Sequence, residues 1–96
     1  MNRQIICRRY FVSGQVQGVF YRASTQQQAQ DLQIRGWVRN CRDGRVEIYA
    51  CGTPEQHQTL KNWLEIGPSH AKVSKIEVRD AEFESCSQFD IRPTSE

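Results

Sequence analysis

Alternation of apolar and polar residues predicts five strands along this chain. Four of them span residues 4–14, 36–42, 45–51 and 72–79, and Phe89 with Ile91 marks a short fifth strand. In the first strand neither set of alternate residues is cleanly apolar, so the pattern leaves its inward face open. In the fourth strand Val73 is out of phase with Ile76 and Val78, which indicates a β-bulge.

Apolar residues at helical spacing predict two helices. The first spans residues 22–34, and Arg35 with Gly36 suits its C-terminal end. Its apolar stripe is thin and consists of Tyr21, Thr25, Ala29 and Leu32.

The second helix begins after Thr53, which is its predicted N-cap. Pro54 suits the first helical position and Gln56 completes a capping box. The helix ends at Gly67-Pro68, and its buried stripe consists of Leu60, Trp63 and Leu64.

The order of these elements predicts the fold. Strand, helix, strand, strand, helix and strand, followed by a final strand, is typical of the split βαβ, ferredoxin-like arrangement. Asp43-Gly44 joins the second and third strands as a two-residue hairpin turn. We therefore expect an α+β fold with two helices on one face of an antiparallel sheet, formed by residues 1–96 as a single domain.

Charge is distributed unevenly along the chain. Residues 1–45 hold eight arginines and two acidic residues, whereas residues 46–96 hold five basic and nine acidic residues. A basic first half suits a small anionic substrate, and a net charge of only +2 argues against a dedicated nucleic-acid binder. No stretch is long and apolar enough for a membrane span or a signal peptide, so we expect a cytoplasmic protein without a membrane partner. We also expect the protein to be a monomer.

The cysteines and histidines do not form a metal-binding pattern. None of the four cysteines belongs to a Cys-x-x-Cys pair, and His57 and His70 stand apart from them. We expect no metal site and no cofactor, and we interpret both histidines as solvated residues on the surface.

The connection between the first strand and the first helix carries the clearest chemical signal. Gly14 and Gly18 lie in this loop, and the helix opens with Arg22 and contains no acidic residue before Asp31. Backbone N–H groups at a helix start attract anions, and the helix dipole adds positive charge there. The pattern therefore predicts a bound phosphate-like anion, with inorganic phosphate or sulfate as a competing ligand.

Two motifs in this region resemble the signatures of the acylphosphatase family. The first is Gly14-Gln-Val-Gln-Gly-Val-Phe-Tyr-Arg22, and the second is Gly36-Trp-Val-Arg-Asn40 followed by Gly44, Val46 and Gly52 at the family spacing. The motifs cover residues 12–52, and the length and element order match over essentially the whole chain. One departure is Tyr21, where the family usually has Phe or Met. Its ring should pack normally, but its hydroxyl needs a partner or solvent.

The resemblance implies hydrolysis of small acyl phosphates and assigns roles to particular residues. Backbone N–H groups of the loop would wrap the phosphoryl group, and the loop consists of Val16, Gln17, Gly18, Val19, Phe20 and Tyr21. Arg22 would hold two phosphoryl oxygens through its guanidinium fork, which matches phosphate bidentately. Asn40 would position the attacking water, since a neutral amide both donates and accepts hydrogen bonds.

The leaving group decides which phosphate chemistry is compatible with these residues. An acyl phosphate releases a carboxylate, whose pKa of about 4 makes it a good leaving group without a general acid. A phosphomonoester releases an alkoxide, which normally needs a metal ion or a positioned acid. Because neither is evident beside Arg22, we expect direct attack of water on acyl phosphates, without metal or covalent intermediate.

Three alternatives were compared with this interpretation. A non-catalytic module that binds acyl phosphate, carbamoyl phosphate or another anion also fits the loop, but the presence of both Arg22 and Asn40 favours turnover. RNA-recognition domains share the topology, but residues 45–51 lack their aromatic motif. Cys86 and Arg92 have the spacing of a tyrosine phosphatase nucleophile and arginine, yet no glycine lies between them to form a phosphate cradle.

Cys7 and Cys51 form a separate hypothesis. The first and third strands are neighbours in the split βαβ arrangement, and both cysteines are predicted to point to the open face of the sheet. Cross-strand neighbours have Cβ atoms about 4.5–5.5 Å apart, which a disulfide can bridge with modest adjustment. A reducing cytosol argues against the bond.

Overall fold

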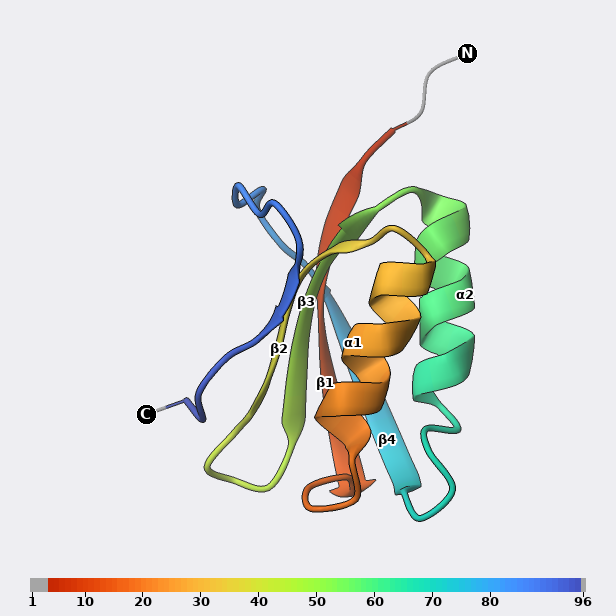
Figure 1. Cartoon of the computed structure of the whole chain (residues 1–96), viewed down its shortest axis with the longest axis vertical. Coiled ribbons are helices and arrows are strands. Elements are labelled where there is room, and N and C mark those ends of the chain that lie inside the picture. The colour runs from red at the N-terminus through yellow and green to blue at the C-terminus, as the bar shows by residue number, and fades with distance from the viewer. Residues whose placement is uncertain (1–3, 96) are drawn as a thin grey trace.

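The computed structural model describes residues 4–95, so residues 1–3 and 96 of the predicted domain lie outside the described part. Two helices cover one face of a five-stranded sheet whose strand order is β4-β1-β3-β2-β5 (Figure 1). The helices are α1 (Tyr21–Asp31) and α2 (Pro54–Leu64). The strands are β1 (Ile6–Gln15), β2 (Arg35–Asn40), β3 (Val46–Gly52), β4 (Lys72–Asp80) and β5 (Phe89–Ile91).

The sheet is antiparallel except at one edge. Strands β4, β1, β3 and β2 pair antiparallel, as predicted, whereas β5 pairs parallel to β2. The difference arises because the chain leaves β4 at one edge and crosses the open face of the sheet before it reaches the other edge. The Tyr49 hydroxyl, on that face, donates to the carbonyl oxygen of Glu82 at 2.7 Å and accepts from the backbone N–H of Glu84 at 2.6 Å. These contacts guide the crossing segment toward β2.

A bulge in β4 adjusts the end of β1 where the loop begins. Ser13 pairs with Lys75 but Gly14 pairs with Val73, so Ser74 is the extra residue and the predicted bulge is confirmed. Gly14 has φ +123°, and a Cβ atom there would lie 2.1 Å from the carbonyl oxygen of Lys72. Only glycine fits this position, which directs the chain out of the sheet and into the loop.

The main core lies between the sheet and the two helices. The structure resolves the ambiguous face of β1, because Tyr10 and Val12 point to the helices and are fully buried. The capping box at Thr53 and Gln56 is present as predicted. Trp63, expected in the buried stripe of α2, packs only at the border of the core.

Helix α1 is shorter at its C-terminal end than the predicted span of residues 22–34. It ends at Asp31, and Gln33 then adopts a left-handed conformation with φ 61°. The N–H of Ile34 bonds back to the carbonyl oxygen of Ala29 at 2.8 Å, and its side chain is buried in the core. Arg35 and Gly36 therefore belong to β2 and not to the helix end.

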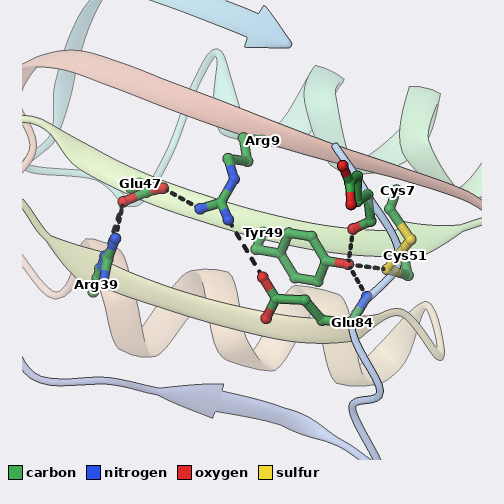
Figure 2. Close-up of polar contacts among 8 residues, drawn as sticks. Cys7, Arg9, Arg39, Glu47, Tyr49, Cys51 and Glu84 are labelled. Carbon is green, nitrogen blue, oxygen red and sulfur yellow. Dashed lines mark hydrogen bonds and ion pairs between the residues drawn. A yellow bond between two sulfur atoms is a disulfide. The ribbon is translucent and has the colours of Figure 1, made fainter. Parts of the chain in front are cut away.

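The open face of the sheet carries a second cluster of aromatic and charged side chains (Figure 2). Glu47 is only 4% exposed and is held by Arg9 at 2.6 Å and Arg39 at 2.8 Å. The guanidinium groups of both arginines also lie over the ring of Trp37. This buried carboxylate is thus paired on both sides, as burial of a charge requires.

His57 is fully buried, so the prediction of a solvated surface position was wrong for this residue. Its Nε2–H donates to the carbonyl oxygen of Ile6 at 2.7 Å, and its Nδ1 accepts from the Tyr10 hydroxyl at 2.6 Å. Because a carbonyl can only accept, the contact with Ile6 places a proton on Nε2, and in the neutral imidazole Nδ1 is then the acceptor. Burial lowers the pKa of His57 below its ordinary value. His70 is exposed, as expected.

We expect the neutrality of His57 to make fold stability depend on pH. A lowered pKa in the folded state means that the stabilisation is complete above about 6.5, the pKa of an unfolded histidine. It is lost as the pH falls below that value through the lower pKa of the folded state. Urea denaturation between pH 7.5 and 5 should show a loss of stability that disappears in His57→Gln and persists in the control His70→Gln. An equal loss in all three proteins would contradict this assignment.

Candidate active site

The predicted anion loop connects β1 to α1 and lies at the same end of the molecule as the β2–β3 turn (Figure 1). Helix α1 begins at Tyr21, one residue earlier than predicted, and Phe20 is its N-cap in a left-handed conformation with φ 63°. The first backbone bond of the helix runs from Ser24 N–H to the carbonyl oxygen of Phe20 at 3.0 Å. The amides of the preceding first turn are therefore left without an intrahelical acceptor.

A hollow of about 300 Å³ opens at this helix start, a size at the lower end for small-molecule sites. Four of the six predicted loop residues line it, together with Arg22 and two residues that sequence reasoning did not select. The lining consists of Val16, Gly18, Phe20, Tyr21, Arg22, Ala23 and Ile91. Gln17 and Val19 do not line the hollow, and the Val16 side chain is part of the core.

Arg22 is half-buried in this hollow and has no acidic neighbour to neutralise it. It takes part in none of the six ion pairs found within residues 4–95, and the first turn of α1 contains no acidic residue. Permanently charged Arg22 thus lines the same hollow as a helix start whose first amides lack an intrahelical acceptor. This arrangement favours an anion.

Tyr21, the departure from the family pattern, is accommodated in the interior. Its side chain is only 1% exposed and its hydroxyl donates to the carbonyl oxygen of Leu64 at 2.7 Å. The ring lies against that of Trp63, with centroids 5.8 Å apart. Burial raises the pKa of the Tyr21 phenol far above its ordinary value, so the hydroxyl remains a donor. The end of α2 therefore provides the partner that the Tyr21 hydroxyl needs, and Tyr21 anchors the start of α1.

Gln17 makes a contact that the sequence did not suggest. Its side-chain amide donates to two carbonyl oxygens of the β2–β3 turn, that of Cys41 at 2.8 Å and that of Arg45 at 2.9 Å. The same turn is closed by a bond from Cys41 N–H to the carbonyl oxygen of Arg45. Gln17 therefore ties the anion loop to the turn that directly follows Asn40. Sequence reasoning gave no signal for this role, because the contact joins residues 24 and 28 positions apart.

Asn40 is the last residue of β2 and shares a face of the sheet with Val38, the face that the helices cover. It is not among the residues that line the hollow. Its Oδ1 is buried and has no hydrogen-bond partner within the described residues. An unpaired amide oxygen is able to accept a hydrogen bond from a water molecule.

The alternative phosphatase pair lies elsewhere and lacks a cradle. Cys86 packs against the open-face cluster that contains Cys7 and Cys51, and burial raises the pKa of its thiol. The Arg92 guanidinium lies over the Trp37 ring, 4.8 Å from its centroid. Within residues 4–95, no group of three or more His, Cys, Asp or Glu side chains is arranged to hold a metal ion. None of the described helices is long and apolar enough to span a membrane.

Cys7 and Cys51 are paired in register on β1 and β3, with their Cα atoms 4.2 Å apart, and a disulfide joins them (Figure 2). The Sγ of Cys51 lies 3.2 Å from the Tyr49 hydroxyl that holds the crossing segment. Cys41 and Cys86 are free thiols. The bridge lies at the start of β1, whereas the anion loop follows its end.

Comparison with known proteins agrees with these features. The family model for acylphosphatase matches residues 8–91. An acylphosphatase of Legionella pneumophila is 41% identical over 90% of this chain and 94% of its own length. One from Cupriavidus metallidurans is 47% identical over 88% of this chain and 90% of its own length.

Solved structures show the same relationship in three dimensions. An acylphosphatase from Coxiella burnetii superposes with a TM-score of 0.88 and 41% identity, covering 92% of this chain and 93% of its own. A structure of full-length HypF in the phosphate- and nucleotide-bound form superposes with a TM-score of 0.90 and 26% identity, covering 98% of this chain but 13% of HypF. The match therefore extends over nearly all of this chain, in its sequence and in its fold. The chain belongs to the acylphosphatase family.

Proposed function

We propose that this protein hydrolyses the carboxyl-phosphate bond of small acyl phosphates to a carboxylate and inorganic phosphate. The observation that carries the proposal is the hollow at the start of α1, where Arg22 has no acidic partner among residues 4–95 and the first amides of the helix lack an intrahelical acceptor. Membership of the acylphosphatase family supports the same reaction.

The proposed roles follow from the chemistry of each group. The backbone amides of residues 16–21 and the guanidinium of Arg22 hold the phosphoryl oxygens and stabilise the charge that develops on them. Asn40 positions the attacking water through its unpaired amide oxygen. A bound phosphoryl group and water then lie in fixed orientation, which removes much of the entropic barrier.

The reaction proceeds by attack of the water oxygen on phosphorus. The bond from phosphorus to the acyl oxygen breaks, and the electron pair leaves with the carboxylate. The proton of the water passes to a phosphoryl oxygen of the substrate itself. Since a carboxylate with a pKa of about 4 needs no protonation on leaving, the site requires no general acid. We propose a monomeric enzyme that inorganic phosphate or sulfate inhibits by occupying the same loop.

The cytoplasmic location remains a prediction from the sequence. The disulfide between Cys7 and Cys51 favours an oxidising environment, because reducing compartments keep thiols reduced.

The reaction class is tested by comparing benzoyl phosphate with phenyl phosphate in the presence of EDTA. Both carry a phenyl ring, but the first releases a carboxylate and the second a phenolate with a pKa of about 10. We expect phosphate release from benzoyl phosphate to be faster by roughly a thousandfold or more, because charge on the leaving oxygen dominates a loose transition state. Equal rates, or complete loss of activity in EDTA, would contradict the proposed mechanism.

The same preparation distinguishes the enzyme from a non-catalytic anion-binding module. If the folded protein releases no phosphate from benzoyl phosphate but its thermal midpoint rises with added phosphate, the loop binds anions without turnover. If phosphate does not change the midpoint either, the anion loop itself is wrongly assigned.

Gln17→Ala tests the link between the anion loop and the turn that follows Asn40. We expect kcat/KM for benzoyl phosphate to fall roughly 10- to 100-fold, because small displacements of positioning groups are costly to catalysis. The free energy of unfolding should fall by only about 1–2 kcal/mol, the contribution of two modest hydrogen bonds. Gln58→Ala is the matched control, since among residues 4–95 the Gln58 side chain bonds only to exposed Asn62 on α2. Unchanged kinetics in Gln17→Ala would show that the contact does not position the site.

A further inference from the structure

Phe20 occupies a position that neither backbone conformation nor core packing explains. Its side chain is 80% exposed, so the fold gains little from burying it. Its φ of 63° is unfavourable for a bulky residue, whereas Gly18 adopts φ 75° in the same loop without strain. A strained backbone carrying an exposed aromatic ring at a ligand site points to contact with the ligand.

Ile91 contributes a second exposed apolar group to the same hollow. It is 41% exposed and follows Phe89 by two residues on β5, so both side chains point to the face that α1 covers. Phe89 is buried in the core, whereas Ile91 reaches the hollow beside the start of α1. The anion loop and β5, which are far apart in sequence, thus place two apolar side chains at one opening.

The hollow combines one positively charged residue with an otherwise apolar lining. Arg22 is its only charged lining residue among those described, and the Tyr21 hydroxyl is already bonded to Leu64. The remaining lining is apolar or glycine. Such a hollow fits a ligand with an anionic end and an apolar end. Apart from Arg22, the lining residues described here offer no free side-chain partner for a charged or strongly polar acyl group.

We propose that Phe20 and Ile91 bind the acyl group of the substrate and make the enzyme selective for aromatic and larger apolar acyl phosphates over acetyl phosphate. This inference rests on the proposed function, because it concerns the acyl group of the substrate, which the phosphoryl-binding residues do not contact. The backbone amides and Arg22 bind the phosphoryl group, and the acyl group lies against the apolar side chains of Phe20 and Ile91. A methyl group covers little of this surface, whereas a phenyl ring covers much more.

The test is the ratio of kcat/KM for benzoyl phosphate to kcat/KM for acetyl phosphate in each variant. Phe20→Asn removes the ring, and asparagine tolerates the left-handed conformation at this position. Because both substrates share the phosphoryl group, any damage to the loop lowers both values and cancels in the ratio. We expect the ratio to fall roughly tenfold in Phe20→Asn and severalfold in Ile91→Ala, the scale on which apolar pockets discriminate.

Phe83→Asn is the matched control, because Phe83 is 72% exposed and lies outside the hollow. We expect this variant to keep the ratio of the unmodified protein. Turnover of both substrates with an unchanged ratio in Phe20→Asn and Ile91→Ala would overturn the acyl assignment alone. Failure of the unmodified, folded protein to hydrolyse either substrate would instead overturn the proposed function, and this inference with it.

Discussion

Replacing Arg22 by glutamine is expected to lower kcat/KM for benzoyl phosphate by roughly a thousandfold or more. An arginine that stabilises a transferring phosphoryl group contributes on this scale, because its charge acts where negative charge is concentrated. Arg22→Lys keeps the charge but loses the planar fork, so it should recover only part of the activity. Steady-state phosphate release from the three proteins measures both effects.

The stability of the fold should not fall in Arg22→Gln, although the activity does. This difference separates an effect on catalysis from an effect on folding. Arg22 makes no ion pair within the described residues and stands in the first turn of α1, where a positive charge opposes the helix dipole. Thermal unfolding of Arg22→Gln should therefore occur at the same temperature or slightly higher. Arg42→Gln is the control for loss of an arginine, since Arg42 is exposed in the β2–β3 turn. Loss of activity that only accompanies unfolding would contradict the role of Arg22.

Removing the disulfide should produce the largest change in stability. Cys7 and Cys51 are separated by 44 positions in the sequence, and closing a loop of this length restricts the unfolded chain considerably. We expect the double variant Cys7→Ala, Cys51→Ala to lose about 2–4 kcal/mol of unfolding free energy. For a domain of this size, that loss lowers the thermal midpoint by roughly 10–30 °C.

The disulfide also determines the number of free thiols, and its removal should leave the activity unchanged. Thiol titration in denaturant should find two free thiols, Cys41 and Cys86, without reductant and four with it. The double variant should retain the kcat of the unmodified protein at a temperature where both are folded, because the bridge lies at the opposite end of β1 from the anion loop. Four thiols in the untreated protein would show that the bond is not formed.

Local signals in the sequence predicted much of the fold. The capping box at Thr53 and the bulge in β4 depend on a few neighbouring residues, and both are present. The pairing of Cys7 with Cys51 also followed from the strand order and the alternation of side chains. The capping box and the bulge were predictable because capping and strand alternation act over short distances, whereas the cysteine pairing also required the strand order of the predicted fold.

Features that depend on contacts across the molecule were not predictable in the same way. The burial of His57 depends on Tyr10 and the carbonyl oxygen of Ile6, more than forty residues away. The parallel pairing of β5 depends on how Tyr49 holds the crossing segment. A single sequence shows no periodic pattern for such contacts.

The residues of the candidate site also divide into those that the sequence predicted and those that it did not. The motif that contains Arg22 and the loop glycines identified the hollow, because these residues are adjacent in sequence. The contribution of Ile91 and the contact of Gln17 with the β2–β3 turn appear only when distant strands are brought to the same end of the sheet.

In the proposed reaction the loop and Arg22 hold the phosphoryl group while water attacks phosphorus. Hydrolysis of benzoyl phosphate in ¹⁸O-labelled water tests it most directly, with enough enzyme that spontaneous hydrolysis is negligible. Attack on phosphorus places one labelled oxygen in the phosphate and none in the benzoate, which is the predicted result. Label in the benzoate would show attack on the carbonyl carbon and would contradict the proposed mechanism.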